Sequence, residues 1–381
     1  MGRALPTPNF LYNKTDAMIE KTLAKLISFK TVSQDQEENQ RALDWIKSQI
    51  EGLPLYVKEL KSRGFFSLVI TTQKTKKPIL WLVAHIDVVP ATKEIFVPRI
   101  KNKKLYGRGA FDMKFAIACY LELLKVLGTG LSNYDFGVII TTDEEKGGFS
   151  GVKFLLEKGF SSEACFLPDG GQAWNFEKAA KGAYHLSIES KGKSAHGSRP
   201  WLGENALENL MDFLFALKKH FPTEPCSIKN HYHPTINVGR IEGGEVANKV
   251  PAFAQALIDI RFPLSTNQAK LKKVLWSTKS KFKNIRLKEL VFAPAYENSF
   301  SSPYLKIFYK IARNKFNIRS KGIISHGTSD ARFFAVKKIP LIVTRPRGGG
   351  HHSENEWIDL EDLDKFYLVL KEFVEKTTKI S

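Results

Sequence analysis

Cysteine is scarce in this 381-residue sequence, which contains only Cys119, Cys165 and Cys226. The three are far apart, odd in number and without the CxxC spacing that is typical of zinc ribbons and thiol oxidoreductases. A disulfide framework of the kind that holds small secreted domains together is therefore excluded. We expect three reduced, buried thiols, which fits a cytoplasmic protein.

Long apolar runs are also missing. None reaches the roughly 18 residues that a membrane-spanning helix requires, and segment 1–18 has no signal-peptide core. We therefore expect a cytoplasmic protein with no membrane partner. Internal repeats and low-complexity segments are absent too, whereas an apolar share of 43% is enough to build proper cores. A chain of this length is expected to form two domains.

Acidic residues are outnumbered, because 58 Lys and Arg against 39 Asp and Glu give a net charge of +19. This excess is explained either by a nucleic-acid or anionic-membrane partner or by a lysine-rich surface with no such role. The basic residues occur in small scattered groups rather than along one helix face, and no nucleic-acid-binding motif accompanies them. We favour the second explanation and expect no specific nucleic-acid partner.

The first half of the chain predicts a doubly wound α/β domain with a mostly parallel sheet. Continuous apolar runs at 78–84, 136–141 and 164–168 are typical of strands that are buried on both faces. Helical patterns at 113–127 and 149–158 alternate with these runs. Such alternation is the signature of parallel strands joined by helices.

The pattern changes near residue 181. Strands with one exposed face and two helices follow, as expected of a small α+β domain. Buried-strand character returns at 339–344 and a helix closes the chain. The simplest organisation is a catalytic domain formed by 1–180 and 293–381, with a smaller domain at 181–292 inserted into it.

Side chains able to bind metal follow the buried strands. Because ligands bind at the carboxyl ends of strands in open α/β sheets, we expect these side chains to converge on one rim. They are His85 and Asp87, then Asp143, Glu144 and Glu145, then Asp169, and finally His351 and His352.

Each of these residues alone has an ordinary explanation. A single His is more often a hydrogen-bonded loop residue, and Asp112 alone would be a helix N-cap. Their joint placement favours a metal site, because carboxylates that share a pocket repel unless cations neutralise them. Two Zn²⁺ ions and a bound hydroxide would balance the three charges of Asp112, Glu145 and Asp169.

Four segments resemble motifs of the dizinc metallopeptidases, the family of aminoacylase, acetylornithine deacetylase, succinyl-diaminopimelate desuccinylase and glutamate carboxypeptidase. The resemblance extends from about residue 15 to 376. It implies a catalytic α/β domain with an inserted dimerisation (lid) domain, and therefore a homodimer. The segments are AHIDVVP (84–90), YGRGAFDMK (106–114), TTDEEKGG (141–148) and HSENE (352–356).

The resemblance implies two Zn²⁺ per chain, for which Co²⁺ or Mn²⁺ could substitute. His85 and Asp169 would bind one ion, Glu145 and His352 the other, and Asp112 would bridge both. His352 is preferred to the adjacent His351 because the family spacing is His-x-x-Asn-Glu.

Two further carboxylates receive roles from the same resemblance. Asp87 would orient the imidazole of His85 from behind. Glu144 would be the general base. It would take a proton from the water that bridges the metal ions, which turns that water into hydroxide, and would later protonate the leaving amine.

Four more residues are substrate-site candidates. His196 would stabilise the oxyanion across the dimer, and Asn248 would contact the substrate. Arg261 would bind a substrate carboxylate, although an ion pair with a neighbouring acid is an equally good explanation. Arg332, in a stretch similar to the desuccinylase branch, is a second candidate for that carboxylate.

The sequence therefore predicts a zinc-dependent hydrolase that cleaves an amide in a small substrate. An N-acyl amino acid and a dipeptide both remain open as that substrate. The alternative is a catalytically silent family member that acts as a binding or scaffold protein.

Overall fold

The computed structural model describes residues 12–224, 232–299 and 301–380, with side chains from residue 18 onward. The chain forms two compact units. The first comprises Met1–Lys178, Asn298–Ile323 and Ser329–Ser381, and the second comprises Ala179–Glu297 and Ile324–Thr328. The sequence predicted an insertion at 181–292. The second unit also contains Ile324–Thr328, a separate segment of which the sequence pattern gives no sign.

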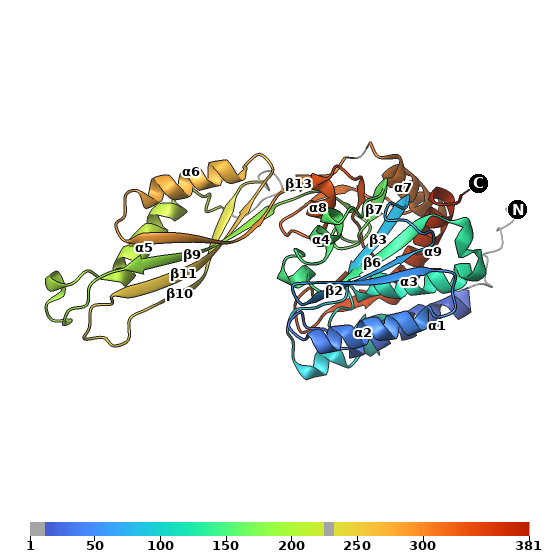
Figure 1. The fold of residues 1–381 in the computed structure, drawn as a ribbon, viewed down its shortest axis with the longest axis horizontal. Coiled ribbons are helices and arrows are strands. Elements are labelled where there is room, and N and C mark those ends of the chain that lie inside the picture. The colour runs from blue at the N-terminus through green and yellow to red at the C-terminus, as the bar shows by residue number, and fades with distance from the viewer. Residues whose placement is uncertain (1–11, 225–231, 300, 381) are drawn as a thin grey trace, which may run out of the picture. The chain divides into compact units, whose positions relative to one another are not determined.

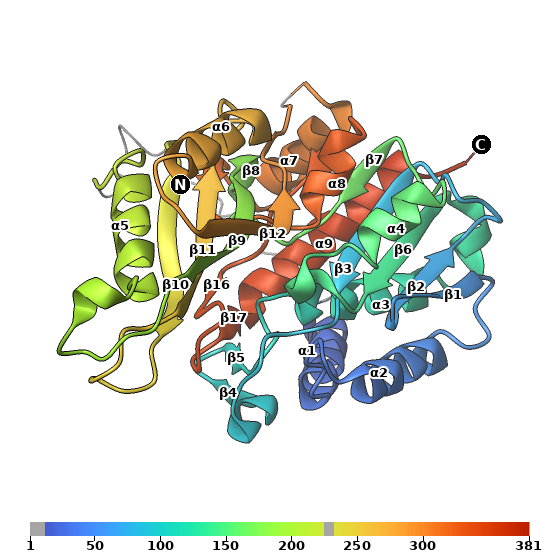
Figure 2. The ribbon, with the colours of Figure 1, turned by 60° about the vertical axis from the view of Figure 1, so that its left-hand side comes forward.

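The first unit is built around a six-stranded sheet (Figure 2). Five strands run in the same direction, and only the second strand in spatial order is antiparallel to its two neighbours. The predicted doubly wound, mostly parallel α/β fold is thus confirmed. In spatial order the strands are β1 (Tyr56–Ser62), β2 (Phe65–Thr71), β6 (Phe136–Thr141), β3 (Leu80–His85), β7 (Ala164–Phe166) and β15 (Leu341–Ile342).

Strand β3 shows why the sheet needs continuous apolar sequence. Leu80 and Leu82 join a large apolar cluster on one face of the sheet, whereas Trp81 is equally buried on the other face. Gly137 of β6 lies beside Trp81, and a Cβ there would fall 2.1 Å from the indole ring. Only glycine leaves room for this tryptophan. The helices of the cluster are α1 (Tyr12–Ser28), α2 (Gln36–Gln49), α3 (Lys114–Leu127), α7 (Pro303–Phe316) and α9 (Leu360–Thr377).

Helix α3 is buried on all sides over most of its length. The stretch Lys114–Asn133 is long and apolar enough to cross a membrane by length and composition alone, but 61% of its most apolar window is buried in the fold. It packs against α1 and β3. An all-round apolar helix inside a protein is a core helix.

The sequence pattern did not predict the smaller elements of this unit. Most of the missed strands have two to four residues, too few to show a period. The further helices are α4 (Val152–Glu157), which lies within the helix predicted at 149–158, and α8 (Ala331–Val336), which was not predicted. A second, antiparallel sheet consists of β16 (Gly348–Gly349), β17 (Trp357–Asp359), β5 (Lys104–Tyr106) and β4 (Arg99–Lys101).

The second unit is a two-layer α+β structure (Figure 1). Its antiparallel sheet has helices α5 (Ala206–Lys218) and α6 (Gln268–Lys279) on one face. Alternate residues of β11 are buried against these helices, which is the period-2 pattern read from the sequence. The strands are, in order, β10 (Thr235–Gly243), β11 (Phe253–Phe262), β9 (Gly182–Lys191) and β12 (Ile285–Ala293). Where the chain passes between the units lie β8 (Phe176–Ala180), β13 (Tyr296–Glu297) and β14 (Gly322–Ser325).

The two cysteines in the described part of the chain are buried thiols, as the sequence predicted. Cys119 and Cys165 are free and buried, and burial raises the pKa of both thiols, whereas Cys226 lies outside the described residues.

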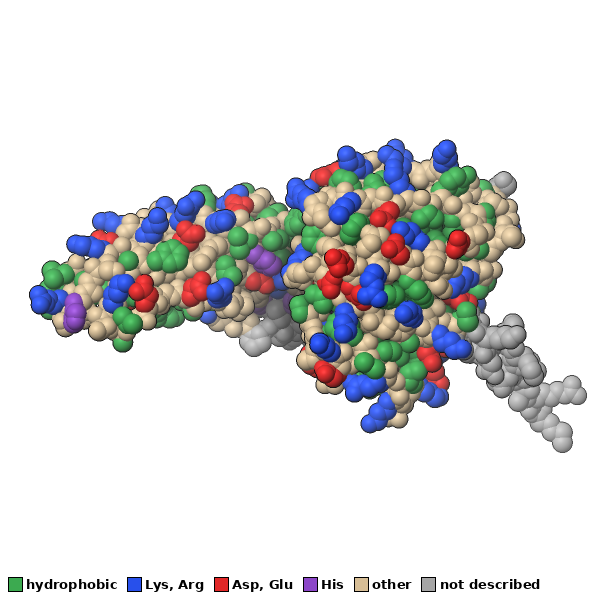
Figure 3. All heavy atoms as spheres, turned by 60° about the horizontal axis from the view of Figure 1, so that its bottom comes forward, with side chains coloured by type: hydrophobic (Ala, Val, Ile, Leu, Met, Phe, Trp, Pro, Cys, Tyr) green, Lys and Arg blue, Asp and Glu red, His purple; other side chains and the backbone are tan. Residues whose placement is uncertain are grey.

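Figure 3 shows Lys and Arg spread over the visible face of both units, with acidic side chains between them. Helix α7 is an exception to the expected scatter, because Lys306 and Lys310 lie one turn apart and exposed on it.

Candidate metal centre

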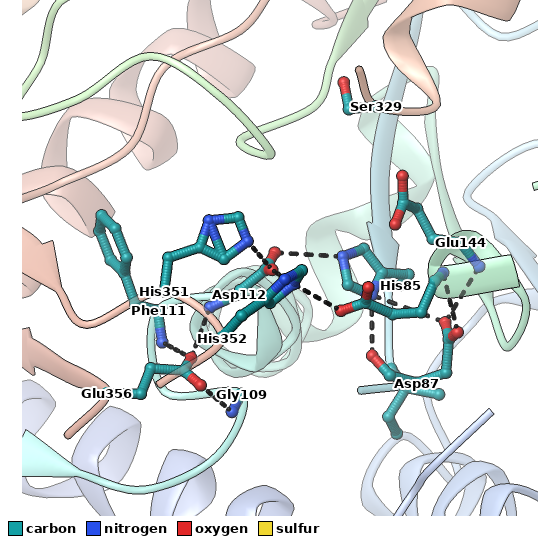
Figure 4. A network of polar contacts seen from close by, with 12 residues as sticks. His85, Asp87, Gly109, Phe111, Asp112, Glu144, Ser329, His351, His352 and Glu356 are labelled. Carbon is teal, nitrogen blue, oxygen red and sulfur yellow. Dashed lines mark hydrogen bonds and ion pairs between the residues drawn. The ribbon is translucent and has the colours of Figure 1, made fainter. Parts of the chain in front are cut away.

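The first unit brings the predicted metal-site residues together at one rim of the sheet (Figure 4). His85 ends β3, Glu144 and Glu145 follow β6, and Asp169 follows β7. These strands are parallel, so their carboxyl ends meet at the same edge. His352 arrives from the turn between β16 and β17 of the smaller sheet.

Asp112 lies at the centre of the cluster. Its Oδ1 is 3.4 Å from Nε2 of His85, and its Oδ2 is 3.0 Å from Nε2 of His352. The two carboxylate oxygens therefore face two different imidazoles. Although burial opposes it, the contacts with His352 and His85 hold the pKa of Asp112 well below its usual range. A carboxylate placed in this way can bridge two cations.

Glu356 holds the loop that presents Asp112. Its carboxylate is fully buried and accepts hydrogen bonds from the backbone N–H groups of Gly109 (3.0 Å), Phe111 (2.9 Å) and Asp112 (2.9 Å). Arg108 adds a charged hydrogen bond of 2.6 Å. Because three backbone donors of the loop meet one carboxylate, the loop has little freedom to move Asp112. Glu356 belonged to a quoted motif, but the sequence indicated no role for it.

The backbone carbonyl of Asp87 is the nearest partner of the His85 imidazole, and the Asp87 carboxylate, which was expected to orient the ring, lies close behind it. Nδ1 of His85 lies 2.9 Å from the carbonyl oxygen of Asp87 and 3.6 Å from the carboxylate. Since a carbonyl only accepts, Nδ1 carries the proton and Nε2 is left to bind a cation.

The carboxylate of Asp87 has a different task. It accepts hydrogen bonds from the backbone N–H groups of Glu144 (3.2 Å) and Glu145 (3.1 Å), and from the hydroxyl of Ser33 (2.7 Å). Asp87 thus fixes the turn that presents both glutamates, a contact that the sequence did not suggest.

His351 and His352 both reach the cluster. Nε2 of His351 is 2.6 Å from Oδ2 of Asp112, while His352 also lies 3.2 Å from Oε1 of Glu145. The contacts with Asp112 and Glu145 raise the pKa of His352 to about 10. His352 therefore touches both carboxylates of the expected second ion, which favours it over His351 as the ligand.

Glu144 lies on the other side of Asp112. Its carboxylate, the imidazole of His85 and the carboxylate of Asp169 have ligand atoms that all lie within 4.8 Å of one another. Burial and the neighbouring Asp169 raise the pKa of Glu144 well above its usual range. A carboxyl group with a raised pKa is suited to general acid–base work.

The residues fit a pair of metal ions. Nε2 of His85 and Oδ1 of Asp112 are shielded from solvent, and neither forms a hydrogen bond with the described residues. Buried polar atoms usually have partners, so two such atoms that face each other are suited to bind a cation. Imidazole nitrogens and carboxylate oxygens are ligands that Zn²⁺ prefers at roughly 2.0–2.2 Å.

Without metal, the folded protein should become less stable as pH rises, because several carboxyl groups are buried in and around the cluster. Burial raises the pKa of Asp169, and of Asp330 at the start of α8, to about 7. It raises the pKa of Asp143, which directly precedes Glu144, to about 6, compared with roughly 3.9 in an unfolded chain. The folded state therefore retains protons that the unfolded state releases, and this stabilisation is lost as pH rises through the folded pKa values. We expect the Tm of chelator-treated protein to fall from pH 5 to pH 7 in scanning calorimetry.

The metal-loaded protein is the control for that measurement. Bound ions keep Asp169 ionised, so its Tm should fall less over the same range. A chelated protein whose Tm rose from pH 5 to pH 7 would contradict the assignment of these protons.

Arg332 is not placed to bind a substrate. It is buried, and its guanidinium donates to the carbonyl oxygens of Ser329 and Gly147, both at 2.5 Å. Gly147 belongs to the turn after Glu144 and Glu145. The structure therefore gives Arg332 a place behind the catalytic turn, in contrast to the predicted carboxylate contact.

The second unit contains the other three predicted residues. His196 and Asn248 lie on adjoining loops, joined by a 2.7 Å hydrogen bond from Gly197 N–H to the carbonyl of Asn248. The backbone N–H of Ser198 donates to Nδ1 of His196 (3.2 Å), so the neutral ring carries its proton on the exposed Nε2. That tautomer is the one an oxyanion donor needs.

Arg261 forms an ion pair with a neighbouring acid, which was the alternative to binding a substrate carboxylate. Its Nε lies 2.9 and 3.0 Å from the two carboxylate oxygens of Asp259, which also contacts His185 at 3.2 Å. This ion pair joins neighbouring residues of one strand, and it occupies the group that was expected to bind substrate.

Comparison with known proteins agrees with this arrangement. The profile of Peptidase family M20/M25/M40 matches residues 81–376. A succinyl-diaminopimelate desuccinylase of Sulfurovum sp. is 26% identical over 371 residues, covering 94% of this chain and 98% of the relative. An acetylornithine deacetylase of Proteus mirabilis is 29% identical over 219 residues, covering 53% and 54%.

Among solved structures, an M20 family metallo-carboxypeptidase from Sulfolobus solfataricus has a similar fold. Its TM-score is 0.79 at 18% identity, covering 94% of this chain and 98% of that chain. At this identity the likeness concerns the fold alone.

Proposed function

Because the chain belongs to the M20/M25/M40 peptidase family and is a metal-dependent amidohydrolase, we propose that it uses two Zn²⁺ ions to hydrolyse an amide in a small substrate. The resemblance noted in the sequence motifs is confirmed by this membership. An N-acyl amino acid or a dipeptide is the class of substrate. Co²⁺ or Mn²⁺ could replace zinc.

The observation that carries the proposal is the position of Asp112 between two imidazoles. His85 and Asp169 would hold one ion, and Glu145 and His352 the other, with one oxygen of Asp112 facing each side. When bound, the ions lower the pKa of the attacking water and polarise the scissile carbonyl.

Glu144 would move the proton in this reaction. It accepts a proton from the attacking water and then donates it to the amine nitrogen as the amide C–N bond breaks. Asp87 keeps the turn of Glu144 and Glu145 in place through two backbone hydrogen bonds. The products are a carboxylic acid, which ionises to a carboxylate by releasing its proton to solvent, and an amine.

A homodimer through the second unit completes the proposal. Strand β10 is an edge strand whose residues are largely exposed, and Met211 and Phe215 are exposed one turn apart on α5. An edge strand and an apolar helix face suit pairing with a second copy. In the dimer, His196 would stabilise the oxyanion and Asn248 would contact the substrate in the partner's site. We place the enzyme in the cytoplasm.

The purified protein should contain about two transition-metal ions per chain, and a chelator should abolish hydrolysis of a panel of N-succinyl, N-acetyl and dipeptide substrates. The reason is that the clustered carboxylates require cations to neutralise them. Elemental analysis gives the stoichiometry, and added Zn²⁺ should restore the activity. A protein that took up no metal under several loading conditions would overturn the dizinc assignment.

A silent scaffold protein makes the opposite prediction. It would bind metal but would turn over no substrate of that panel. The presence of Glu144 beside His85 and Asp169 supports the enzyme, because a scaffold has no use for a base there.

A further inference from the structure

A cavity of about 890 Å³ lies beside α7, within the first unit. One wall is the face of α7 that carries Lys306, Lys310 and Arg313, and another is segment 318–320, which follows the helix. None of the candidate metal ligands is among the residues that line the cavity. The cavity is therefore separate from the metal centre.

The charged residues that line this cavity are all basic. They are Lys306, Lys310, Arg313 and Arg319, and all four side chains are exposed. No Asp or Glu is among the described residues of the lining. Positive charges gathered around one concave space create a potential that attracts anions.

These four cations have no ionic partner in the described part of the chain. Lys315, further along α7, shows the contrast, because its Nζ lies 3.1 Å from a carboxylate oxygen of Glu372. Lys306 and Lys310 instead place two like charges one turn apart, an arrangement that destabilises a helix. The fold thus keeps this charge available for a ligand.

Hydrogen bonds hold the segment that carries Arg319. The backbone N–H of Lys321 donates to Oδ1 of Asn175 (2.9 Å), and the backbone N–H of Phe176 donates to the carbonyl oxygen of Lys321 (3.0 Å). Next to these contacts, Oγ of Ser320 is shielded from solvent and forms no hydrogen bond with the described residues. A shielded polar atom in the lining that lacks a partner is suited to bind a group of a ligand.

Volume and charge together indicate the class of ligand. The cavity falls within the roughly 300–1,000 Å³ that is usual for small-molecule sites. A ligand with a single carboxylate would neutralise only one of the four cations, whereas linked phosphates place several negative charges within a small volume. Lys and Arg are also the side chains that bind phosphate groups in proteins.

We propose that the cavity beside α7 binds a small polyphosphate, either a free chain of phosphates or the phosphate chain of a nucleotide. The four basic side chains would contact the phosphate oxygens, and the hydroxyl of Ser320 would add a neutral hydrogen bond. The proposal does not depend on the amidohydrolase function, because the cavity shares no lining residue with the metal centre.

The test is calorimetric titration of the full-length, metal-loaded protein with inorganic tripolyphosphate and, in a second series, with ATP. Excess Mg²⁺ keeps either ligand from removing the loaded ions, and the metal content is measured before and after. We expect saturation at one ligand per chain and a Kd that rises with added salt, which screens exposed charges. Equal affinities would identify the phosphate chain as the recognised group, and tighter binding of ATP would identify a nucleotide.

The variants test the position of the site. Lys306→Gln combined with Lys310→Gln should raise Kd by about tenfold or more, because two charged hydrogen bonds are lost. Replacing both lysines by arginine preserves the charge and should keep Kd within about threefold of the wild-type value. The matched control is Lys21→Gln with Lys25→Gln, the same change at the same spacing on α1, where both side chains are exposed. The control should leave Kd unchanged, and all variants should keep normal metal content and hydrolysis.

Any of three results would overturn the proposal. The first is the lack of saturable binding of either ligand at physiological salt. The second is an equal rise in Kd for the α7 and α1 variants, which would reflect net charge and not a site. The third is a short single-stranded RNA that binds more tightly than both small ligands, which would make this face a nucleic-acid interface. A protein that hydrolysed no amide would contradict the proposed function but would leave this binding measurement intact.

Discussion

Glu144→Gln is expected to lower kcat by about 10²–10⁴-fold, while the protein keeps both metal ions. Glutamine has nearly the same shape as glutamate but cannot accept the proton of the attacking water. The backbone hydrogen bond from residue 144 to Asp87 does not involve the side chain, so the turn should be preserved. The measurement pairs kcat with metal content for the same preparation.

The neighbouring residues provide the controls. Glu145→Gln should reduce metal content, because the Glu145 carboxylate lies 3.2 Å from His352. Asp112→Asn should weaken both sites together, since its two oxygens face two imidazoles. If Glu144→Gln also lost metal, Glu144 would be a ligand beside His85 and Asp169 rather than the base. Near-normal turnover would remove it from the mechanism.

Mixing two inactive variants should restore activity. His196→Ala removes a hydrogen-bond donor to the developing oxyanion, which is worth roughly 3 kcal/mol in comparable sites, and Glu144→Gln removes the base. Each homodimer should therefore be nearly inactive. In a mixed dimer, one site combines Glu144 of one subunit with His196 of the other, whereas the second site lacks both groups.

The size of the recovery can be estimated. At random 1:1 exchange about half of the dimers are mixed, and each has one complete site of two, so activity should approach about a quarter of the wild-type value. Subunit exchange is verified by native mass spectrometry. Verified exchange without recovery would place His196 in its own subunit's site or outside catalysis. A monomeric protein would exclude the arrangement directly.

The sequence by itself determined the α/β sheet and the place of the site. Apolar runs such as 78–84 and 136–141 report burial on both faces, because burial is a local property of each residue in a strand. The residue that follows a buried parallel strand must lie at the rim. His85, Glu144 and Asp169 could therefore be placed near one another although they are far apart in the chain.

The smaller sheet could not be foreseen, whereas α7 was missed although its buried residues Leu305, Phe308, Ile311 and Ala312 follow helical spacing. Strands such as β16 and β17 have too few residues to display a period, and their pairing is a long-range contact that no local pattern encodes. For the same reason, the sequence pattern does not show that segment 324–328 belongs to the second unit.

Only the tertiary structure decided which charged side chains are free. Arg332 and Arg345 look alike in the sequence, yet Arg332 is buried and donates to the carbonyl of Gly147, whereas Arg345 is only partly buried and donates to the carbonyl of Gly171. Likewise, Glu356 is separated from Asp112 by 244 positions but holds its loop. A side chain's role depends on which partners neutralise it, and those partners come from distant segments that only the folded chain brings together.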